Sequence, residues 1–285
     1  MTINMKRNEI EKIEVDLLLD AIYRYHGYDF RNYARVSLKR RLNNMVRYAE
    51  VTHISELLNK VLYDKEFFDR FLQEMSISVT EMFRDPHFYL TMRSKIIDIL
   101  KTYPFVKIWH AGCSTGEEVY SMAILLHEEK FLGKTQIYAT DYNPYSLEIA
   151  REGVYHLKDI QKYSQSYLDA GGKISLADYY YGKYKSVKFH DFLKEKITFA
   201  HHNLVTDTSF GEMNMIICRN VLIYFDKNLQ SKVYSLFNDS LIHDGFLCLG
   251  TKESMSFSET HPCFELFSDK EKIYRKNSSF AYEKL

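Results

Sequence analysis

Residues 109–118 read WHAGCSTGEE, and this stretch decides the fold. The apolar residues that lead into it from Phe105 predict a buried strand, and the small residues predict a tight turn. Gly112 and Gly116 allow backbone shapes and close ligand approach that a Cβ atom would block. Apolar residues then recur at helical spacing, at Val119, Met122, Ala123 and Leu126. This strand, turn and helix predict a βα unit whose helix N-terminus suits a carboxylate or phosphate.

The same turn also has a purely structural interpretation. Ser114 with Glu117, or Thr115 with Glu118, has the spacing of a capping box at the start of a helix. Taken alone, the glycine turn leaves a ligand site and an ordinary helix start equally open.

Asp141 favours the ligand site. It ends the next predicted strand, TQIYATD, about 25 residues after Gly116, where doubly wound folds place a carboxylate that accepts hydrogen bonds from a ribose. Its structural alternative is to start the following helix. Asn143 and Pro144 already supply that start and Gly153 the stop, so we expect Asp141 to be free for a ligand.

Short apolar runs alternate with helical patterns from Phe105 onward, as expected of βαβ units and a mostly parallel sheet. The first ninety residues instead have helical periodicity only. We therefore predict a helical domain over 1–67, a linker over 68–92 and an α/β domain over 93–285. The five strand candidates are FVKIWHAG, TQIYATD, KITFAHHN, MNMIICRN and FLCLGT.

More than fifty residues separate the second and third strand candidates, too many for one crossover helix. The interval contains DYYYGKYKSVKFHDF, which is partly alternating, with Gly182 placed like a hairpin turn. A small antiparallel β insert over about 160–200 is predicted, and a long structured loop is the alternative.

The segment ICRNVLIYFD, residues 217–226, follows the fourth strand candidate. Open α/β sheets bind ligands in loops at the carboxyl ends of their strands, so an Arg-Asn pair beside a Tyr is a candidate site. Alternatively, the apolar residues of the segment pack inward and Tyr224 covers the edge of the core.

Composition excludes several classes of protein. Lys+Arg and Asp+Glu both total 38, and a protein that binds nucleic acid through bulk charge would be more basic. No apolar run has membrane-spanning length, and the N-terminal residues lack the apolar region of a signal peptide. Four scattered cysteines have no CxxC spacing, so we expect reduced thiols in a cytoplasmic protein and no metal site.

Taken together, these segments resemble the CheR chemotaxis methyltransferases. SVTEMFRD (78–85), AGCSTGEEVYS, ATD, HHNL, ICRNVLIYFD and the late GTKES occur in the order found in that family. The resemblance covers nearly the whole chain. It implies an α/β fold with a Rossmann-like S-adenosylmethionine methyltransferase sheet and a small antiparallel β insert, preceded by an all-α N-terminal domain.

The resemblance also implies an activity, the transfer of the methyl group of S-adenosyl-L-methionine to glutamate side chains of chemoreceptors, with S-adenosyl-L-homocysteine as the product. Arg84, Arg219 and Tyr224 match the catalytic positions, Tyr224 facing the transferable methyl. The implied cofactor contacts are Ser78, Thr80, Arg84, Gly112, Glu118, Asp141, Asn203, Leu204, Cys218 and Arg219. The chain departs from the family at Ser78, where relatives often have Asn, at Met82, and at Thr251-Lys252.

A basic stretch supplies the candidate for substrate recognition. Residues 31–49 contain six Lys or Arg and no acid, and the apolar stripe Leu38, Leu42, Met45 and Ala49 leaves Arg40 and Arg47 on the opposite face. A solvated helix face is the ordinary interpretation. In the family a basic N-terminal helix faces the methylation helix of the receptor, which makes Arg40 and Arg47 the expected substrate contacts.

In some relatives the β insert binds a receptor C-terminal tail peptide, and a packed insert without that role remains the alternative here. Two other functions stay open at this point: the same cofactor with a non-receptor protein or small-acid acceptor, and a cofactor-binding signalling module without turnover.

Overall fold

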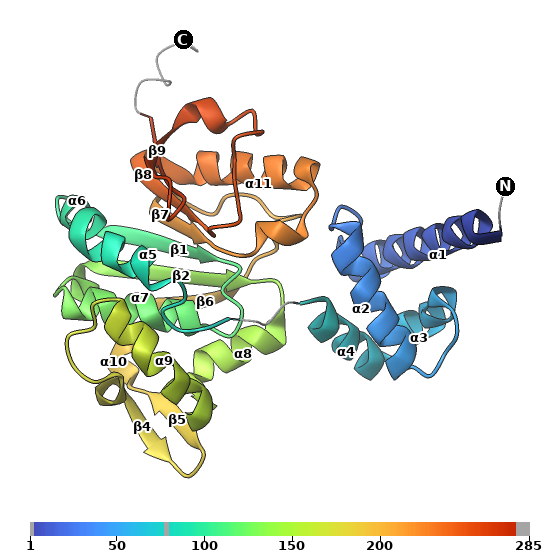
Figure 1. Ribbon diagram of the computed structural model, residues 1–285, viewed down its shortest axis with the longest axis horizontal. Helices are drawn as coiled ribbons and strands as arrows, with labels where there is room; N and C mark the ends of the chain where they lie inside the picture. The colour runs from blue at the N-terminus through green and yellow to red at the C-terminus, as the bar shows by residue number, and fades with distance from the viewer. Residues whose placement is uncertain (1–2, 77–79, 278–285) are drawn as a thin grey trace. The chain divides into compact units, whose positions relative to one another are not determined.

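The computed structural model describes residues 3–76 and 80–277, and Figure 1 shows their helices and strands. Contacts divide them into two units. The first unit holds the described residues up to 76 together with Ile223–Gln230, and the second holds the others. The domain limits at residues 67 and 92 stay predictions. No helix in either described stretch is both long and apolar enough to cross a membrane.

The first unit is helical, as its periodicity predicts. Leu38, Leu42 and Met45 are buried, whereas Ala49 lies just beyond the helix end and is half-buried. Asp64 starts the last helix by accepting a hydrogen bond from the Phe67 N–H at 3.0 Å. The elements are α1 (Ile3–His26), α2 (Arg35–Tyr48), η1 (Ile54–Glu56), α3 (Leu57–Tyr63) and α4 (Lys65–Met75).

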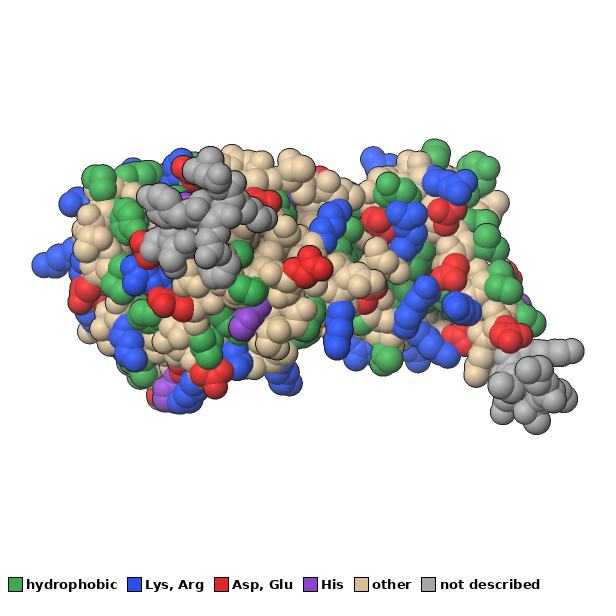
Figure 2. Space-filling view, turned by 90° about the horizontal axis from the view of Figure 1, so that it is seen from above, with side chains coloured by type: hydrophobic (Ala, Val, Ile, Leu, Met, Phe, Trp, Pro, Cys, Tyr) green, Lys and Arg blue, Asp and Glu red, His purple; other side chains and the backbone are tan. Residues whose placement is uncertain are grey.

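The basic stretch is less uniform than its sequence suggests. Arg41 is buried and donates to the carbonyls of Glu74 and Met75 at the end of α4, at 2.6 and 2.9 Å. Arg35 and Lys39 pair with acids of α1, namely Asp16 and Glu11. Figure 2 shows the resulting mixture of blue and red side chains on this unit. An acid-free stretch of sequence therefore meets acids from another helix.

Residues 223–230 belong to the first unit because they pair with the chain before α2. Tyr33 and Phe225 form a β-bridge, and their rings lie 5.0 Å apart. The Ala34 N–H donates to the Tyr224 carbonyl at 2.7 Å, and the Asp226 N–H donates to the Asn32 carbonyl at 2.9 Å. Nothing in the local sequence signals this pairing.

The second unit contains a seven-stranded sheet of order β6-β2-β1-β7-β8-β10-β9. The five predicted strands form its parallel part, and β10 and β9 add antiparallel strands that the sequence reading did not anticipate. The order reverses between β1 and β7, which is where such sheets bind ligands. The strands are β1 (Val106–Ala111), β2 (Thr135–Asp141), β6 (Ile197–His201), β7 (Met213–Cys218), β8 (Leu241–Leu249), β9 (Phe264–Ser268) and β10 (Ile273–Lys276).

Helices between the strands complete the expected α/β fold. In α7 (Glu117–Glu128) every residue from Val119 to Leu126 is buried, so this helix lies inside the unit. Helix α8 (Pro144–Glu152) begins at Asn143, whose side chain accepts from the Tyr145 N–H, and ends at Gly153 in a left-handed conformation, both as predicted. Helix α11 (Lys227–Ser240) precedes β8.

The antiparallel insert is confirmed as a three-stranded sheet of order β3-β5-β4 (Figure 1). Its strands are β3 (Val154–His156), β4 (Tyr180–Lys183) and β5 (Ser186–Phe189), accompanied by α9 (Leu157–Asp169) and α10 (Asp191–Lys194). The prediction of a turn at Gly182 was wrong. Gly182 lies within β4, and Tyr184, with φ +55°, begins the turn.

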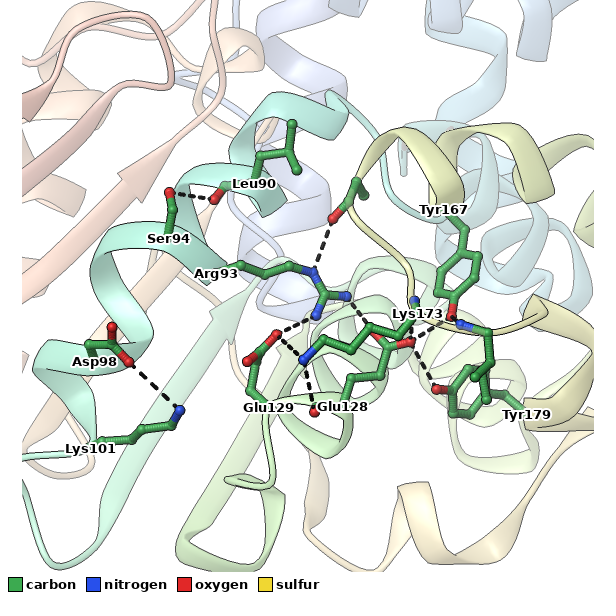
Figure 3. A network of polar contacts seen from close by, with 12 residues as sticks. Leu90, Arg93, Ser94, Asp98, Lys101, Glu128, Glu129, Tyr167, Lys173 and Tyr179 are labelled. Atoms are coloured by element: carbon green, nitrogen blue, oxygen red, sulfur yellow. Dashed lines mark hydrogen bonds and ion pairs between the residues drawn. The ribbon is translucent and has the colours of Figure 1, made fainter.

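A buried polar network joins the insert to α7 (Figure 3). Arg93 follows α5 (Pro86–Thr91) in a π-helical turn, Met92–Ile96, that continues into α6 (Ile97–Leu100). Its guanidinium pairs with Glu128 and Glu129 at the end of α7 and donates to the Ala170 carbonyl. The hydroxyls of Tyr167 and Tyr179 donate to the same Glu128 oxygen at 2.5 and 3.0 Å.

Candidate active site

The carboxyl ends of β1, β2 and β7 meet at one edge of the sheet. Gly112 follows β1 with φ +79°, and a Cβ atom there would lie 2.6 Å from a methyl group of Val221, in the loop after β7. The N–H groups of Gly112 and Cys113 both donate to the Thr140 carbonyl at 2.8 Å. Only glycine at 112 therefore lets these loops approach so closely.

Asp141 stands at the end of β2 and is buried. Its Oδ2 accepts from the Ser114 N–H and its Oδ1 from the Asn143 N–H, both at 2.9 Å. The prediction that Asp141 would be free was therefore wrong, although each carboxylate oxygen can accept a further bond. Burial raises the pKa of Asp141, and these N–H donors oppose the shift.

Helix α7 does not start with either predicted capping box. Its N-cap is Gly116, with φ +93°, and no side chain caps it. Glu117 instead accepts from the Thr115 hydroxyl at 2.7 Å, and burial raises the pKa of Glu117 to about 7. Ser114 adopts φ +49°, which is uncommon for a residue with a side chain.

Arg219 follows β7, and its side chain is only 1% exposed. The guanidinium donates to Glu118 Oε2 at 2.7 Å and to Asp85 Oδ2 at 2.6 Å. Its central carbon lies 4.3 Å from the centre of the Phe88 ring, a cation–π contact. Arg219 thus joins three segments that are far apart in sequence: the loop after β7, the start of α7 and the linker.

The charges of this cluster reinforce one another. Burial alone would raise the pKa of Glu118, but Arg219 and His110 outweigh it and hold that pKa below its ordinary value. Burial would lower the pKa of Arg219, but Glu118, Tyr89 and Asp85 raise it. The pair therefore stays ionised. The Nδ1 atom of His110 lies 3.5 Å from Glu118 Oε1. The sequence reading missed two residues of this cluster, His110 and Asp85.

The linker element contributes backbone as well as side chains. Phe83 and Asp85 have φ of +52° and +55° on either side of Arg84, so this segment is held in an uncommon conformation. The Phe83 N–H donates to Ser121 of α7 at 3.0 Å, and the Arg84 carbonyl accepts from Arg219 at 3.4 Å. Thr80 is half-buried. Ser78 lies outside the described residues.

The remaining predicted residues divide between the two units. Asn203 and Leu204, just after β6, are buried, and the Asn203 side chain accepts from the Val205 N–H at 3.0 Å. Cys218 ends β7, and burial raises the pKa of its thiol well above its ordinary value. Tyr224 falls in the first unit, where its ring centre lies 5.7 Å from the Arg41 guanidinium carbon. The cofactor candidates of the second unit thus lie at the ends of four adjacent strands, β6, β2, β1 and β7, with Thr80 and Arg84 from the linker.

Two buried polar atoms fit a ligand at this edge. Within the described part of the chain, Ser114 Oγ and Arg219 Nε are two of eight buried side-chain atoms without a hydrogen-bond partner. Such atoms are rare in folded proteins, and a polar ligand beside the Gly112 turn would satisfy them. Glu118 and Asp141 supply acceptors, and Arg219 a donor, within the same group of loops.

Comparison with known proteins agrees with this geometry. Residues 78–272 match the CheR methyltransferase SAM binding domain, and residues 13–76 match the CheR methyltransferase all-alpha domain. A Pseudomonas putida protein named as the methyltransferase Cher3 is 46% identical over 265 residues, covering 93% of this chain and 97% of that protein.

More distant relatives carry a functional name. The chemotaxis protein methyltransferase of Listeria innocua is 26% identical, covering 80% of this chain and 85% of the relative. Chemotaxis protein methyltransferase 1 of Vibrio cholerae is 28% identical, covering 77% and 81%. The match to the SAM binding domain makes S-adenosyl-L-methionine the cofactor of the second unit. This chain belongs to the CheR family of S-adenosylmethionine-dependent methyltransferases.

Proposed function

We propose that the protein methylates glutamate side chains on the cytoplasmic helices of chemoreceptors, giving glutamate methyl esters. The observation that carries the proposal is the outer face of α2. Arg40 and Arg47 are exposed and, with Asn43 and Val46, line one shallow depression. Among the residues with described side chains, neither arginine forms an ion pair, unlike Arg35 and Lys39. Unpaired cations on an exposed helix suit an acidic partner.

The names of the relatives support the same assignment, since several are chemotaxis protein methyltransferases. With receptor helices as the acceptor, the enzyme acts in the cytoplasm. The insert offers a second contact, because β4 is an edge strand that an extended receptor tail would extend by β-augmentation. Tyr181 and Tyr184 are exposed there.

The cofactor roles follow the positions around the sheet edge. Asp141 would bind the ribose, Asn203 and Leu204 the adenine, and Gly112 and Cys218 would line the path between them. Glu118, Arg219, Thr80 and Arg84 would hold the methionine part, together with Ser78.

The reaction needs no general base. When bound, S-adenosyl-L-methionine would supply a sulfonium methyl; a carboxylate oxygen attacks the methyl carbon as its bond to sulfur breaks, which leaves S-adenosyl-L-homocysteine and a methyl ester. The acceptor glutamate is already ionised at neutral pH, because its ordinary pKa is about 4.3. Alignment of carboxylate and methyl then supplies the rate, and a dry site favours a step in which charge is lost.

This chemistry constrains the arginines. An arginine held tightly to the attacking carboxylate would stabilise the ground state more than the transition state. Arg219 is instead anchored between Glu118 and Asp85, which suits a group that holds the cofactor carboxylate. Tyr224 would give the acceptor glutamate a neutral hydrogen bond.

The test is to incubate the protein with cofactor radiolabelled on its methyl group and with host membranes. Methyl esters are hydrolysed by alkali and release labelled methanol, whereas methylamines are not. We expect alkali-labile label on receptor bands, and a lower kcat with unchanged cofactor affinity for Tyr224→Phe.

Alkali-stable label would contradict the ester. Labelling of another protein or of a small acid would move the acceptor away from receptors. Cofactor binding without any labelling would favour a signalling module without turnover.

A further inference from the structure

Glu253 lies four residues after the end of β8, in the segment GTKES, and its role emerges only from the fold. The residue is 4% exposed. Its Oε2 accepts from the N–H groups of Gly250 and Asn220, at 2.6 and 3.0 Å. Its Oε1 accepts from the Leu222 N–H at 2.7 Å. One carboxylate therefore binds three backbone donors from two different loops.

Two of these bonds hold the chain just after Arg219. Asn220 directly follows the arginine, and Leu222 comes two residues later. Hydrogen bonds to an ionised acceptor are roughly twice as strong as neutral ones, so the loop after β7 is fixed immediately beside Arg219. Asn220 has φ +61°, a conformation that requires support from its surroundings.

Gly250 makes the contact possible. A Cβ atom at this position would lie 2.8 Å from both the Asn220 nitrogen and Glu253 Oε2. The Glu253 N–H in turn donates to the Gly250 carbonyl at 2.9 Å. The turn after β8 is thus built to bring a carboxylate against the loop after β7.

We propose that Glu253 is a positioning residue for Arg219: it sets the backbone from which the guanidinium reaches Glu118 and Asp85. The inference rests on the proposed role of Arg219 in cofactor binding. Glu253 itself need not touch cofactor or acceptor. Replacement of Glu253 should therefore weaken cofactor binding only while Arg219 is present.

A double-mutant cycle on the affinity for S-adenosyl-L-homocysteine tests this, with calorimetry of the whole protein as the measurement. Gln at 253 places an amide N–H₂ against a backbone N–H, so one or more of the three bonds is lost. We expect Glu253→Gln to weaken binding at least tenfold in the wild-type background and less than threefold in an Arg219→Ala background. Coupling of this kind is the signature of residues that act as one network.

Glu271→Gln is the matched control, because Glu271 is another buried acid, bonded to Ser268 between β9 and β10. We expect it to change the affinity less than twofold. An equal loss from Glu253→Gln in both backgrounds would make Glu253 merely structural and overturn the proposal. So would wild-type affinity in either Glu253→Gln or Arg219→Ala.

If Glu253→Gln fails to fold, amide hydrogen exchange in the unaltered protein decides. The amides of Asn220, Leu222 and Gly250 should be protected at least a hundredfold, and unprotected rates would overturn the inference. Product binding needs no acceptor. A protein that binds S-adenosyl-L-homocysteine but methylates no receptor would therefore refute the proposed function and leave this inference standing.

Discussion

Arg219 brings a full positive charge into the interior of the second unit, where Glu118 and Asp85 meet it. Burying an isolated charge is costly, and an ion pair compensates only when its hydrogen bonds are well formed. Here two separate carboxylates are bonded at 2.7 Å or less. The arrangement keeps the guanidinium in place before any ligand arrives, which is the preorganisation that binding sites need.

Glu117, next to Glu118, has the opposite character. Its folded pKa of about 7 lies above its ordinary value of 4.5, because burial penalises the charged form. The folded state therefore favours the protonated acid. Its contribution to stability is complete below about pH 4.5 and is lost as the pH rises through about 7.

We expect Glu117→Gln to increase the free energy of unfolding at pH 8 by about 1–3 kcal/mol and to change it little at pH 4.5. The amide keeps a hydrogen-bonding partner for Thr115 without a charge. Chemical denaturation of both proteins at the two pH values measures the difference. Glu152→Gln, at an exposed acid of α8, should show no such pH dependence, and a gain independent of pH would contradict the assignment.

Some of these residues could be predicted from sequence and others could not. Asp141 and Arg219 stand at the ends of strand candidates, so local pattern was enough to select them, whereas Glu118 was selected by the resemblance to the family. Asp85, His110 and Glu253 act only through partners from distant segments, which no local pattern reveals. A glycine and a glutamate three residues apart after a strand, as at Gly250 and Glu253, was the available signal.

At the scale of elements, the parallel strands were predictable because apolar runs mark buried strands. The position of the turn in the β insert was not predictable in this way. Sequence reasoning assigns a positive φ to glycine, but here Tyr184 adopts it and Gly182 stays in the strand. β9 and β10 were missed because FELFS and IYRK are short and carry charged residues, as strands near a sheet edge commonly do.

The network of Figure 3 gives an element-scale prediction. Arg93 contacts both Glu128 and Glu129 of α7 and the Ala170 carbonyl after α9, so its loss leaves the Glu128 carboxylate without its cation, while Lys173 still pairs with Glu129. We expect Arg93→Ala to lower the free energy of unfolding by about 3 kcal/mol. Urea denaturation followed by circular dichroism measures the change.

Lys162→Ala is the comparison, since Lys162 forms an exposed pair with Asp159 within α9. Such pairs contribute about 0–1 kcal/mol. If the two substitutions cost the same, the network does not hold the insert to α7.

At the scale of the whole molecule, the residues proposed for function are divided between the units. The cofactor candidates with described contacts belong to the second unit, whereas Arg40, Arg47 and Tyr224 belong to the first. Neither unit holds all the residues proposed for methyl transfer. The change in periodicity was enough to predict two domains. It could not predict that residues 223–230 belong to the first unit although they lie between segments of the second.

Charge reversal on the first unit tests this division. We expect Arg40→Glu with Arg47→Glu to raise the KM for receptor about tenfold at low salt, with the effect shrinking as salt screens the charges. The affinity for S-adenosyl-L-homocysteine should not change. Lys134→Glu, an exposed cation of the second unit, is the control, and an unchanged KM in the double variant would remove α2 as the receptor contact.

The pairing of residues 32–34 with 224–226 also determines how this enzyme can be recombined with its relatives. A chimaera that replaces only the first 77 residues would set a foreign helical domain against the native Tyr224-Phe225-Asp226 segment. The graft has to carry two separate pieces of chain, the N-terminal one and the short segment after β7. Among relatives, substitutions in residues 32–34 are therefore expected to occur together with substitutions in residues 224–226.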